Sequence, residues 1–137
     1  MVTITGRYQG ELRCVSIHGP SGVELTTDAP VDNHGKGRAF SPTDLLATAL
    51  ATCMVTTMAI WAERHAIAFA GATFTTTKEM TTTAPRRVAR LGVTVRVPGE
   101  YSAEQKQRLE AVAHACPVHQ SLHESVAIDL KLEWETT

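Results

Sequence analysis

Apolar and polar residues alternate over six segments of the chain, and this period of two predicts β-strands. The first three segments are short and follow one another closely near the N-terminus. Two longer segments flank a proline- and arginine-rich tip in the second half, and the last segment lies near the C-terminus. The expected strands are residues 2–9, 11–18, 23–27, 69–82, 88–97 and 126–134.

Apolar residues recur every three to four positions in one long stretch, which predicts a helix from residue 41 to about residue 65. Ser41 can cap this helix, Pro42 fits its first position and Asp44 stands at the capping-box position. At about 1.5 Å per residue the helix would be about 34 Å long. We therefore expect a central helix with much of its surface covered. The polar residues 28–40 before it predict a long surface loop.

A second helix is expected from Ser102, with Gln105 at the capping-box position, and Pro117 must end or restart it. The order of elements is then three strands, a helix, two strands, a helix and a strand. This order predicts an α+β fold. A length of 137 residues fits one domain, so we expect residues 1–137 to form a single domain.

The composition is that of an ordinary soluble globular protein, with 43% hydrophobic residues and a formal net charge of −1. No basic surplus or polybasic stretch suits nucleic acid or anionic lipid, so neither is expected as a partner. The N-terminal residues lack the apolar segment of a signal peptide. No apolar run approaches the ~20 residues of a membrane span. These features predict a cytoplasmic protein.

Three cysteines in such a chain do not form a secreted disulfide framework. Cys14 lies in a predicted strand with no polar partner nearby, and we expect it to be a buried, inert thiol. Cys53 and Cys116 are too far apart in the sequence for a local CxxC loop. If the fold brings them together, they could act as an attacking and a resolving thiol, the minimum for peroxide reduction without a metal or cofactor.

The local sequence leaves the role of each of these two thiols open. Cys53 shares a helical stripe with Leu50 and Ile60, so it could be a small core residue. Cys116 precedes Pro117, and if that proline opens a new helical turn, Cys116 is its N-cap. Its sulfur would then face free N–H groups, which favours the thiolate. A packing role at the helix break is the alternative.

A metal site is a further alternative for the same segment. Cys116, His119 and His123 have spacings that could place three ligands on one side of a turn, and Cys53 could complete a tetrahedron. The absence of a CxxC knuckle and the Cys-Pro geometry weaken this hypothesis.

Three motifs resemble the OsmC/Ohr family of osmotically inducible and organic hydroperoxide resistance proteins. They are residues 26–30 (TTDAP), residues 41–47 (SPTDLLA) leading to Cys53, and residues 116–122 (CPVHQSL). The resemblance covers essentially the whole chain and includes the order of elements. It implies an OsmC-like fold with antiparallel sheets around a long central helix. It also implies an intertwined homodimer with two active sites at the subunit interface.

The resemblance also implies the roles of the thiols, because Cys53 matches the peroxidatic cysteine and Cys116 the resolving cysteine. The implied activity is a thiol-dependent peroxidase that passes through a Cys53 sulfenate and a Cys53–Cys116 disulfide. An external dithiol such as a dihydrolipoyl group would reduce the disulfide, and no bound cofactor or metal is implied. Apolar neighbours of Cys53, including Leu50 and Met54, would suit an organic peroxide. This order of roles reverses the local expectation that Cys116 is the more reactive thiol.

One departure from the family pattern concerns the charged partner of the thiolate. Members of the family carry a glutamate after the proline of the helix start, paired with an arginine, whereas this chain has Thr43 there. Asp44 is one residue later, on a different face of the helix. Arg7 near the first hairpin and Arg38 in the loop before the helix are the candidate arginines, and a surface charge with no catalytic role is the alternative for each. The departure supports an alternative hypothesis, a non-enzymatic protein of this fold that binds a small molecule and has lost the peroxidase activity.

Overall fold

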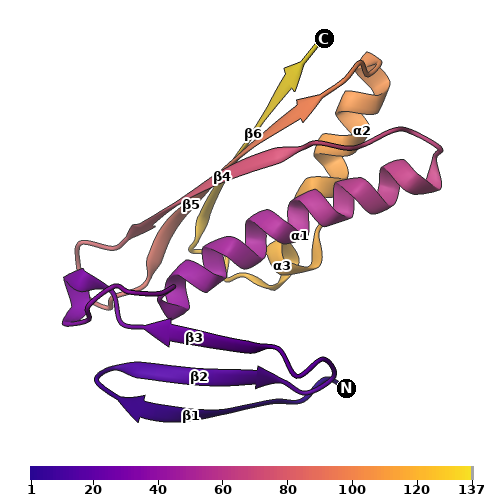
Figure 1. Ribbon diagram of the computed structural model, residues 1–137. Helices are drawn as coiled ribbons and strands as arrows, with labels where there is room; N and C mark the ends of the chain where they lie inside the picture. Colours follow the sequence, from indigo (N-terminus) through magenta and orange to yellow (C-terminus); the bar gives the residue numbers. More distant parts are fainter. Residues whose placement is uncertain (137) are drawn as a thin grey trace. The chain divides into compact units, whose positions relative to one another are not determined.

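The structure, a computed structural model, describes residues 1–136 and consists of two compact units, Met1–Leu46 and Ala47–Thr137 (Figure 1). The strands are β1 (Ile4–Gly10), β2 (Arg13–His18), β3 (Glu24–Asp28), β4 (Thr73–Met80), β5 (Val88–Pro98) and β6 (Ala127–Glu135). The helices are α1 (Pro42–Arg64), α2 (Ala103–His114), the short α3 (Pro117–Ser121) and the 3-10 turn η1 (Val31–Asn33). The predicted α+β class and the order of elements are confirmed, although the strand expected from residue 69 begins at Thr73.

The first unit contains the antiparallel sheet β1-β2-β3. Alternation in β2 buries Val15, which is 4% exposed. Most of the large apolar side chains in this unit are exposed, and Ile4, Tyr8 and Leu25 have exposed fractions of 64%, 65% and 42%. The sheet therefore has little apolar core of its own.

The prediction that Cys14 is a buried thiol is wrong, because Cys14 is exposed. Successive side chains of a strand point to opposite faces of the sheet. Val15 occupies the buried face of β2, so its neighbour Cys14 points the other way. The apolar character of the segment did not reveal which of the two faces would be covered.

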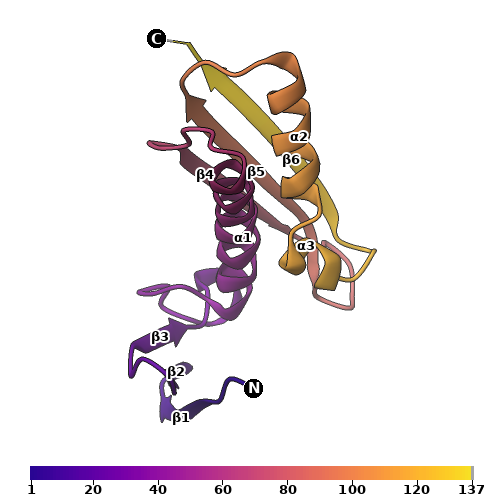
Figure 2. The same cartoon turned by 90° about the vertical axis from the view of Figure 1, so that its right-hand side faces the viewer.

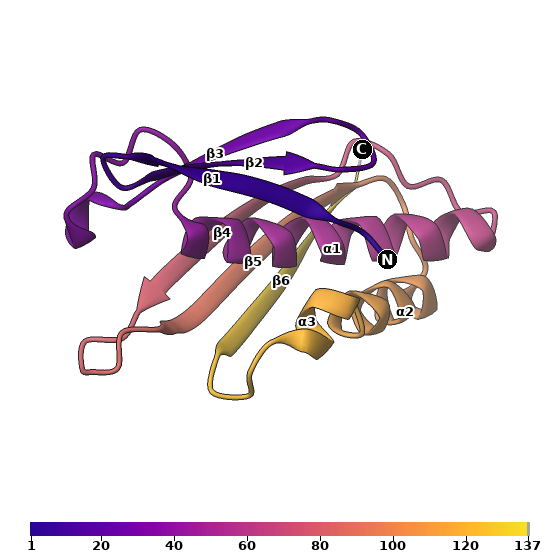
Figure 3. The ribbon, with the colours of Figure 1, turned by 90° about the horizontal axis from the view of Figure 1, so that it is seen from below.

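The second unit contains the sheet β4-β5-β6, and its central strand β5 carries much of the core. The alternate residues Leu91, Val93, Val95 and Val97 are at most 1% exposed. Helices α1 and α2 cover the same face of this sheet (Figure 2). The view from below shows α3 following α2 on that side (Figure 3). From α1, the side chains buried in this unit are Ala47, Leu50, Ala51, Met54, Met58 and Ala62.

The expectation of antiparallel sheets holds for the first sheet and needs correction for the second. Strand β4 pairs with β5 antiparallel, but β6 pairs with β5 in parallel. Parallel neighbours require a crossover connection, and α2 and α3 form it. The crossover is the segment that brings Cys116 back to the sheet face that α1 covers.

Two expectations about the long helix also need correction. Only 33% of the most apolar window of α1 is buried, so much of its surface is uncovered in this chain. By length and composition α1 could cross a membrane, contrary to the expectation that no segment approaches such a span. A core helix of a soluble protein meets the same criterion. The uncovered side includes Ile60, which is 45% exposed.

Candidate functional site

Cys53 lies on the side of α1 that does not form the core of the second unit. It is partly exposed, at the edge of an open groove of about 480 Å³. The groove is lined by Ala49, Thr52, Cys53, Thr56, Thr57 and Ile60 of α1 and by Pro117 and Val118 of α3. The α1 residues recur at intervals of three and one, which places them on one helical face. The alternative of a fully buried core cysteine is therefore wrong for Cys53.

The expected apolar neighbours of Cys53 are also corrected by this arrangement. Leu50 and Met54 are 0% exposed and belong to the buried face of α1. Met54 is adjacent to Cys53 in the helix and so points about 100° away from it, and neither Leu50 nor Met54 is among the residues that line the groove. The apolar lining comes instead from Ala49, Ile60 and Val118.

Cys116 is the N-cap of α3, as its position before Pro117 predicts. Its backbone is extended (φ −61°, ψ 148°), and its Sγ accepts a hydrogen bond from the N–H of His119 at 3.4 Å. Unlike Cys53, its side chain is 0% exposed. The structure thus brings the first turn of α3 against α1 with one accessible and one buried thiol.

The environment of Cys116 does not favour its thiolate. Burial raises the pKa of the Cys116 thiol, the His119 N–H opposes this, and the Cys53 thiol raises the pKa further as a hydrogen-bond partner and as a neighbouring charge. The N-cap geometry was predicted correctly, but burial outweighs its effect on the thiolate. The side-chain interaction also shows that the two thiols, both free, lie beside each other.

The structure gives no support to the metal hypothesis. No three His, Cys, Asp or Glu side chains among residues 1–136 are grouped so that they could hold a metal ion. His119 directs Nδ1 to the carbonyl oxygen of His114, and His123 Nδ1 lies 2.7 Å from Ser125 Oγ. These rings are engaged locally and do not converge with Cys116.

At the start of α1, Asp44 is engaged in capping. The N–H of Ser41 donates to Asp44 Oδ2 at 2.9 Å, and the N–H of Asp44 donates to Ser41 Oγ at 3.0 Å. Thr43 places its hydroxyl 3.2 Å from the Ser41 hydroxyl. The capping box predicted from the sequence is confirmed, and the usual glutamate position holds a neutral hydroxyl group.

The two candidate arginines belong to the first unit, whereas both thiols belong to the second. Arg7 lies in β1, exposed and paired in register with Val15. Arg38 lies in the loop before α1, where Asp28 Oδ2 accepts from its backbone N–H at 3.0 Å and from its Nε at 3.5 Å. Glu11 lies 3.8 Å from the same guanidinium group.

The sequence reasoning missed Asp28, the buried carboxylate that holds Arg38. The hydrogen bond from the Arg38 N–H, assisted by the Arg38 and Arg13 charges, lowers the pKa of Asp28 against the opposing effect of burial. The Asp28 N–H also donates to the Phe40 carbonyl at 3.1 Å, so this residue closes the loop with both backbone and side chain. The available signal was an acid at a strand end followed, ten residues later, by an arginine.

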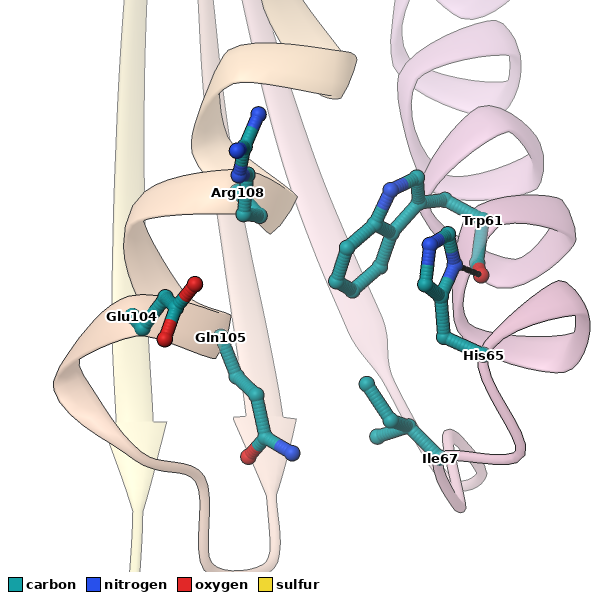
Figure 4. Close-up of a pocket in the computed structure, with 6 residues that line it drawn as sticks. All are labelled: Trp61, His65, Ile67, Glu104, Gln105 and Arg108. Atoms are coloured by element: carbon teal, nitrogen blue, oxygen red, sulfur yellow. Dashed lines mark hydrogen bonds between the residues drawn. The ribbon is translucent and has the colours of Figure 1, made fainter.

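A second cavity of about 480 Å³ lies between the C-terminal end of α1 and the first turns of α2, and contains neither thiol (Figure 4). Trp61 and His65 stack in it with ring centroids 4.1 Å apart, and His65 Nδ1 lies 2.8 Å from the Trp61 carbonyl oxygen. The other lining residues are Ile67, Glu104, Gln105 and Arg108. No cysteine is among the residues that line it, so this cavity lacks the reactive thiols found at Cys53 and Cys116.

The chain is similar to known proteins in both sequence family and fold. The family model described as OsmC-like protein matches residues 35–131. A solved structure from Psychrobacter arcticus 273-4, a protein with a suggested role in osmotic stress and detoxification, is 42% identical, with a TM-score of 0.91 and 96% of each chain covered. No curated protein sequence matches the chain significantly.

Two more distant solved structures share the fold. An organic hydroperoxide resistance protein, OsmC, from Legionella pneumophila is 19% identical, with a TM-score of 0.74 over 97% of this chain and 96% of that one. An organic hydroperoxide resistance protein from Elizabethkingia anophelis, with thiocyanate bound, is 15% identical, with a TM-score of 0.78 over 97% of this chain and 95% of the other.

Proposed function

The chain belongs to the OsmC-like protein family, and on this premise we propose that it is a thiol-dependent peroxidase that reduces organic hydroperoxides. The observation that carries the proposal is the pairing of a partly exposed Cys53 with a buried Cys116 whose pKa is raised. Relatives of the same fold are named for resistance to organic hydroperoxides. An accessible thiol beside a protected one is the arrangement that a two-cysteine peroxidase requires.

The proposed reaction begins at Cys53. Its thiolate attacks the terminal oxygen of R–O–O–H, the S–O bond forms as the O–O bond breaks, and the alkoxide takes a proton from water to leave as the alcohol. The Cys53 sulfenic acid then condenses with the Cys116 thiol to give a disulfide and water. An external dithiol, for which a dihydrolipoyl group is proposed, returns both cysteines to thiols by exchange and is itself oxidised.

The environments of the two thiols support this assignment of roles. Cys53 opens onto the groove, which an organic peroxide could enter, whereas Cys116 is 0% exposed. Burial and the neighbouring sulfur both disfavour negative charge on Cys116. Cys116 is therefore the poorer attacking group and the better placed resolving group. The apolar lining from Ala49, Ile60 and Val118 suits an alkyl or aryl peroxide rather than hydrogen peroxide.

Several further features belong to the same proposal. Arg7 and Arg38 are the proposed charged partners of the site, and Arg38 already has a carboxylate partner in Asp28 in place of the family's glutamate.

A homodimer is proposed because the first sheet and α1 leave many apolar side chains exposed in the single chain. We propose a cytoplasmic location, where reducing conditions would keep the thiols active.

The test is a thiol titration before and after one equivalent of cumene hydroperoxide, followed by peptide mapping. We expect two thiols to be lost in a Cys53–Cys116 crosslink, and turnover when dihydrolipoamide is added. Cys53→Ser should abolish peroxide consumption, and Cys116→Ser should stop after one equivalent because no disulfide can form. Cys14→Ser serves as the matched control, since its exposed thiol lies in the other unit. Turnover that survives Cys53→Ser would exclude the mechanism.

A second candidate function rests on Thr43 and Asp44 at the start of α1. The glutamate position holds a hydroxyl group, and the nearby carboxylate is committed to the helix cap. A protein that binds an apolar or electrophilic small molecule without peroxide turnover would fit this departure. In that case ligands would raise the melting temperature, and both thiols would remain unreacted after peroxide treatment.

A further inference from the structure

Three threonines line the groove beside Cys53, and the hydroxyl groups of two of them already donate hydrogen bonds to the helix backbone. Thr52 Oγ1 donates to the carbonyl oxygens of Thr48 at 2.8 Å and Ala49 at 3.2 Å. Thr57 Oγ1 donates to the carbonyl oxygen of Cys53 at 2.7 Å. Such bonds to the preceding turn of the helix satisfy the only proton that a hydroxyl group carries.

Thr56 is different. Its side chain is exposed, and its hydroxyl makes no hydrogen bond with any residue in the part of the chain that the structure describes, residues 1–136. Thr56 lies three residues after Cys53, so the two Cβ atoms are neighbours on one helical face, about 5–6 Å apart. Side chains of an α-helix lean toward its N-terminus. The Thr56 side chain therefore leans over the turn that carries Cys53.

No charged side chain is among the residues that line the groove itself. Its lining consists of alanine, threonine, cysteine, isoleucine, proline and valine side chains. When a thiolate attacks a hydroperoxide, negative charge passes from the sulfur to the departing alkoxide oxygen. A donor that already points at the position of this charge lowers the barrier. Within the groove, a neutral hydroxyl group is the available side-chain donor.

We propose that the Thr56 hydroxyl donates a hydrogen bond to the alkoxide oxygen of the bound hydroperoxide as the O–O bond breaks. This proposal rests on the peroxidase function proposed above. Thr56 keeps its own proton throughout, and water supplies the proton that completes the alcohol. Thr56 is thus a catalytic residue that contacts the substrate, while Thr52 and Thr57 maintain the helix on either side.

The experiment compares Thr56→Val and Thr56→Ser in a Cys14→Ser background by stopped-flow measurement of Cys53 oxidation by cumene hydroperoxide. We expect Thr56→Val to lower the second-order rate constant by about tenfold to a hundredfold, given the loss of about 10²–10³ for a donor in an enclosed oxyanion site. Thr56→Ser should restore most of the rate. Thr52→Val removes a committed hydroxyl from the same groove and should cost less than Thr56→Val. Thr75→Val, an exposed threonine of β4, is the control.

A second readout separates the proposed contact from an effect on the thiol itself. The rate and pH profile of Cys53 alkylation by iodoacetamide should be the same in Thr56→Val as in the parent, because no alkoxide forms. Equal losses in alkylation and peroxide reaction would overturn the contact with peroxide. A parent protein that never reacts with peroxide would refute the proposed function, whereas a reactive parent with an equally reactive Thr56→Val would refute this inference alone.

Discussion

The two sheets have three strands each but differ in what covers them. In the second unit the alternate residues of β5 are completely buried, and α1 and α2 lie over that face. In the first unit Val15 is the buried apolar side chain among the strands described, while Ile4, Tyr8 and Leu25 are exposed. A small sheet needs a covered apolar face for stability. The second unit supplies its own cover and both thiols, whereas most large apolar side chains of the first unit are exposed.

The difference in apolar exposure between the two sheets supports the proposed homodimer. A surface with many exposed apolar side chains is typical of an interaction site. Most soluble oligomers are symmetric, so a second copy of the same chain is the simplest partner for the first sheet. On this interpretation the second unit, which contains both thiols, folds around its own core. The first unit, which contains the candidate arginines, is stabilised by association with a second copy of the chain.

The largest expected effect is on the covered sheet. Leu109 of α2 is 0% exposed, so Leu109→Ala should lower the free energy of unfolding by about 2–5 kcal/mol through lost burial and the cavity left behind. Urea denaturation monitored by circular dichroism measures this loss. Val112→Ala, at a partly buried position on the same helix, should cost less. A loss under about 1 kcal/mol for Leu109→Ala would contradict the assignment of this core.

A smaller effect, dependent on protein concentration, is expected on the uncovered sheet. Leu25 of β3 is 42% exposed in the single chain, so Leu25→Asp should hardly affect an isolated monomer. If a second copy covers it, the charge would weaken association by about 1–3 kcal/mol through an unpaired, buried carboxylate. Sedimentation velocity at several concentrations measures the change. Glu24→Asp, next to it on the strand, is the control, and an unchanged dimer in Leu25→Asp would place the interface elsewhere.

The smallest effect concerns the loop that holds Arg38. Because the pKa of Asp28 is lowered in the folded state, its carboxylate stabilises the fold at pH values above its ordinary pKa of about 3.9. This stabilisation is lost as the pH falls through the lowered value. Asp28→Asn should therefore melt at a lower temperature than the parent at neutral pH, and the difference should shrink below about pH 4. A difference that is constant with pH would show that ionisation of Asp28 plays no part.

Much of this architecture could be predicted from the sequence, because local signals specify the elements. Ser41 and Asp44 form the expected capping box, Ser102 and Gln105 form another, and the six strands lie within the expected segments, apart from small differences at their ends. The N-cap position of Cys116 followed from the proline after it. Each of these features depends on residues a few positions apart, so a short stretch of sequence is sufficient to indicate it.

Other features depend on contacts distant in the sequence. Alternation identifies β6 as a strand but contains no information on its direction, so the parallel pairing with β5 was not foreseen. The same limit explains the exposure of Cys14, since a period of two does not say which face is covered. The burial that raises the pKa of Cys116 comes from packing around α3 rather than from its own motif. Proximity of the two thiols could be inferred only by resemblance.

The sulfur of Cys116 has a structural task besides its chemical one, since it accepts the N–H of His119 at the start of α3. A disulfide sulfur is a weaker acceptor than a thiolate or thiol, so oxidation should loosen the first turn of this short helix. The redox state of Cys53 and Cys116 would then be detectable in the backbone of α3. We expect the His119 amide to exchange its hydrogen with solvent faster in the oxidised protein, while amides in the middle of β5 keep their protection. The same loosening would expose the disulfide to the incoming dithiol. Oxidation of the two cysteines would therefore itself favour the reduction step that follows.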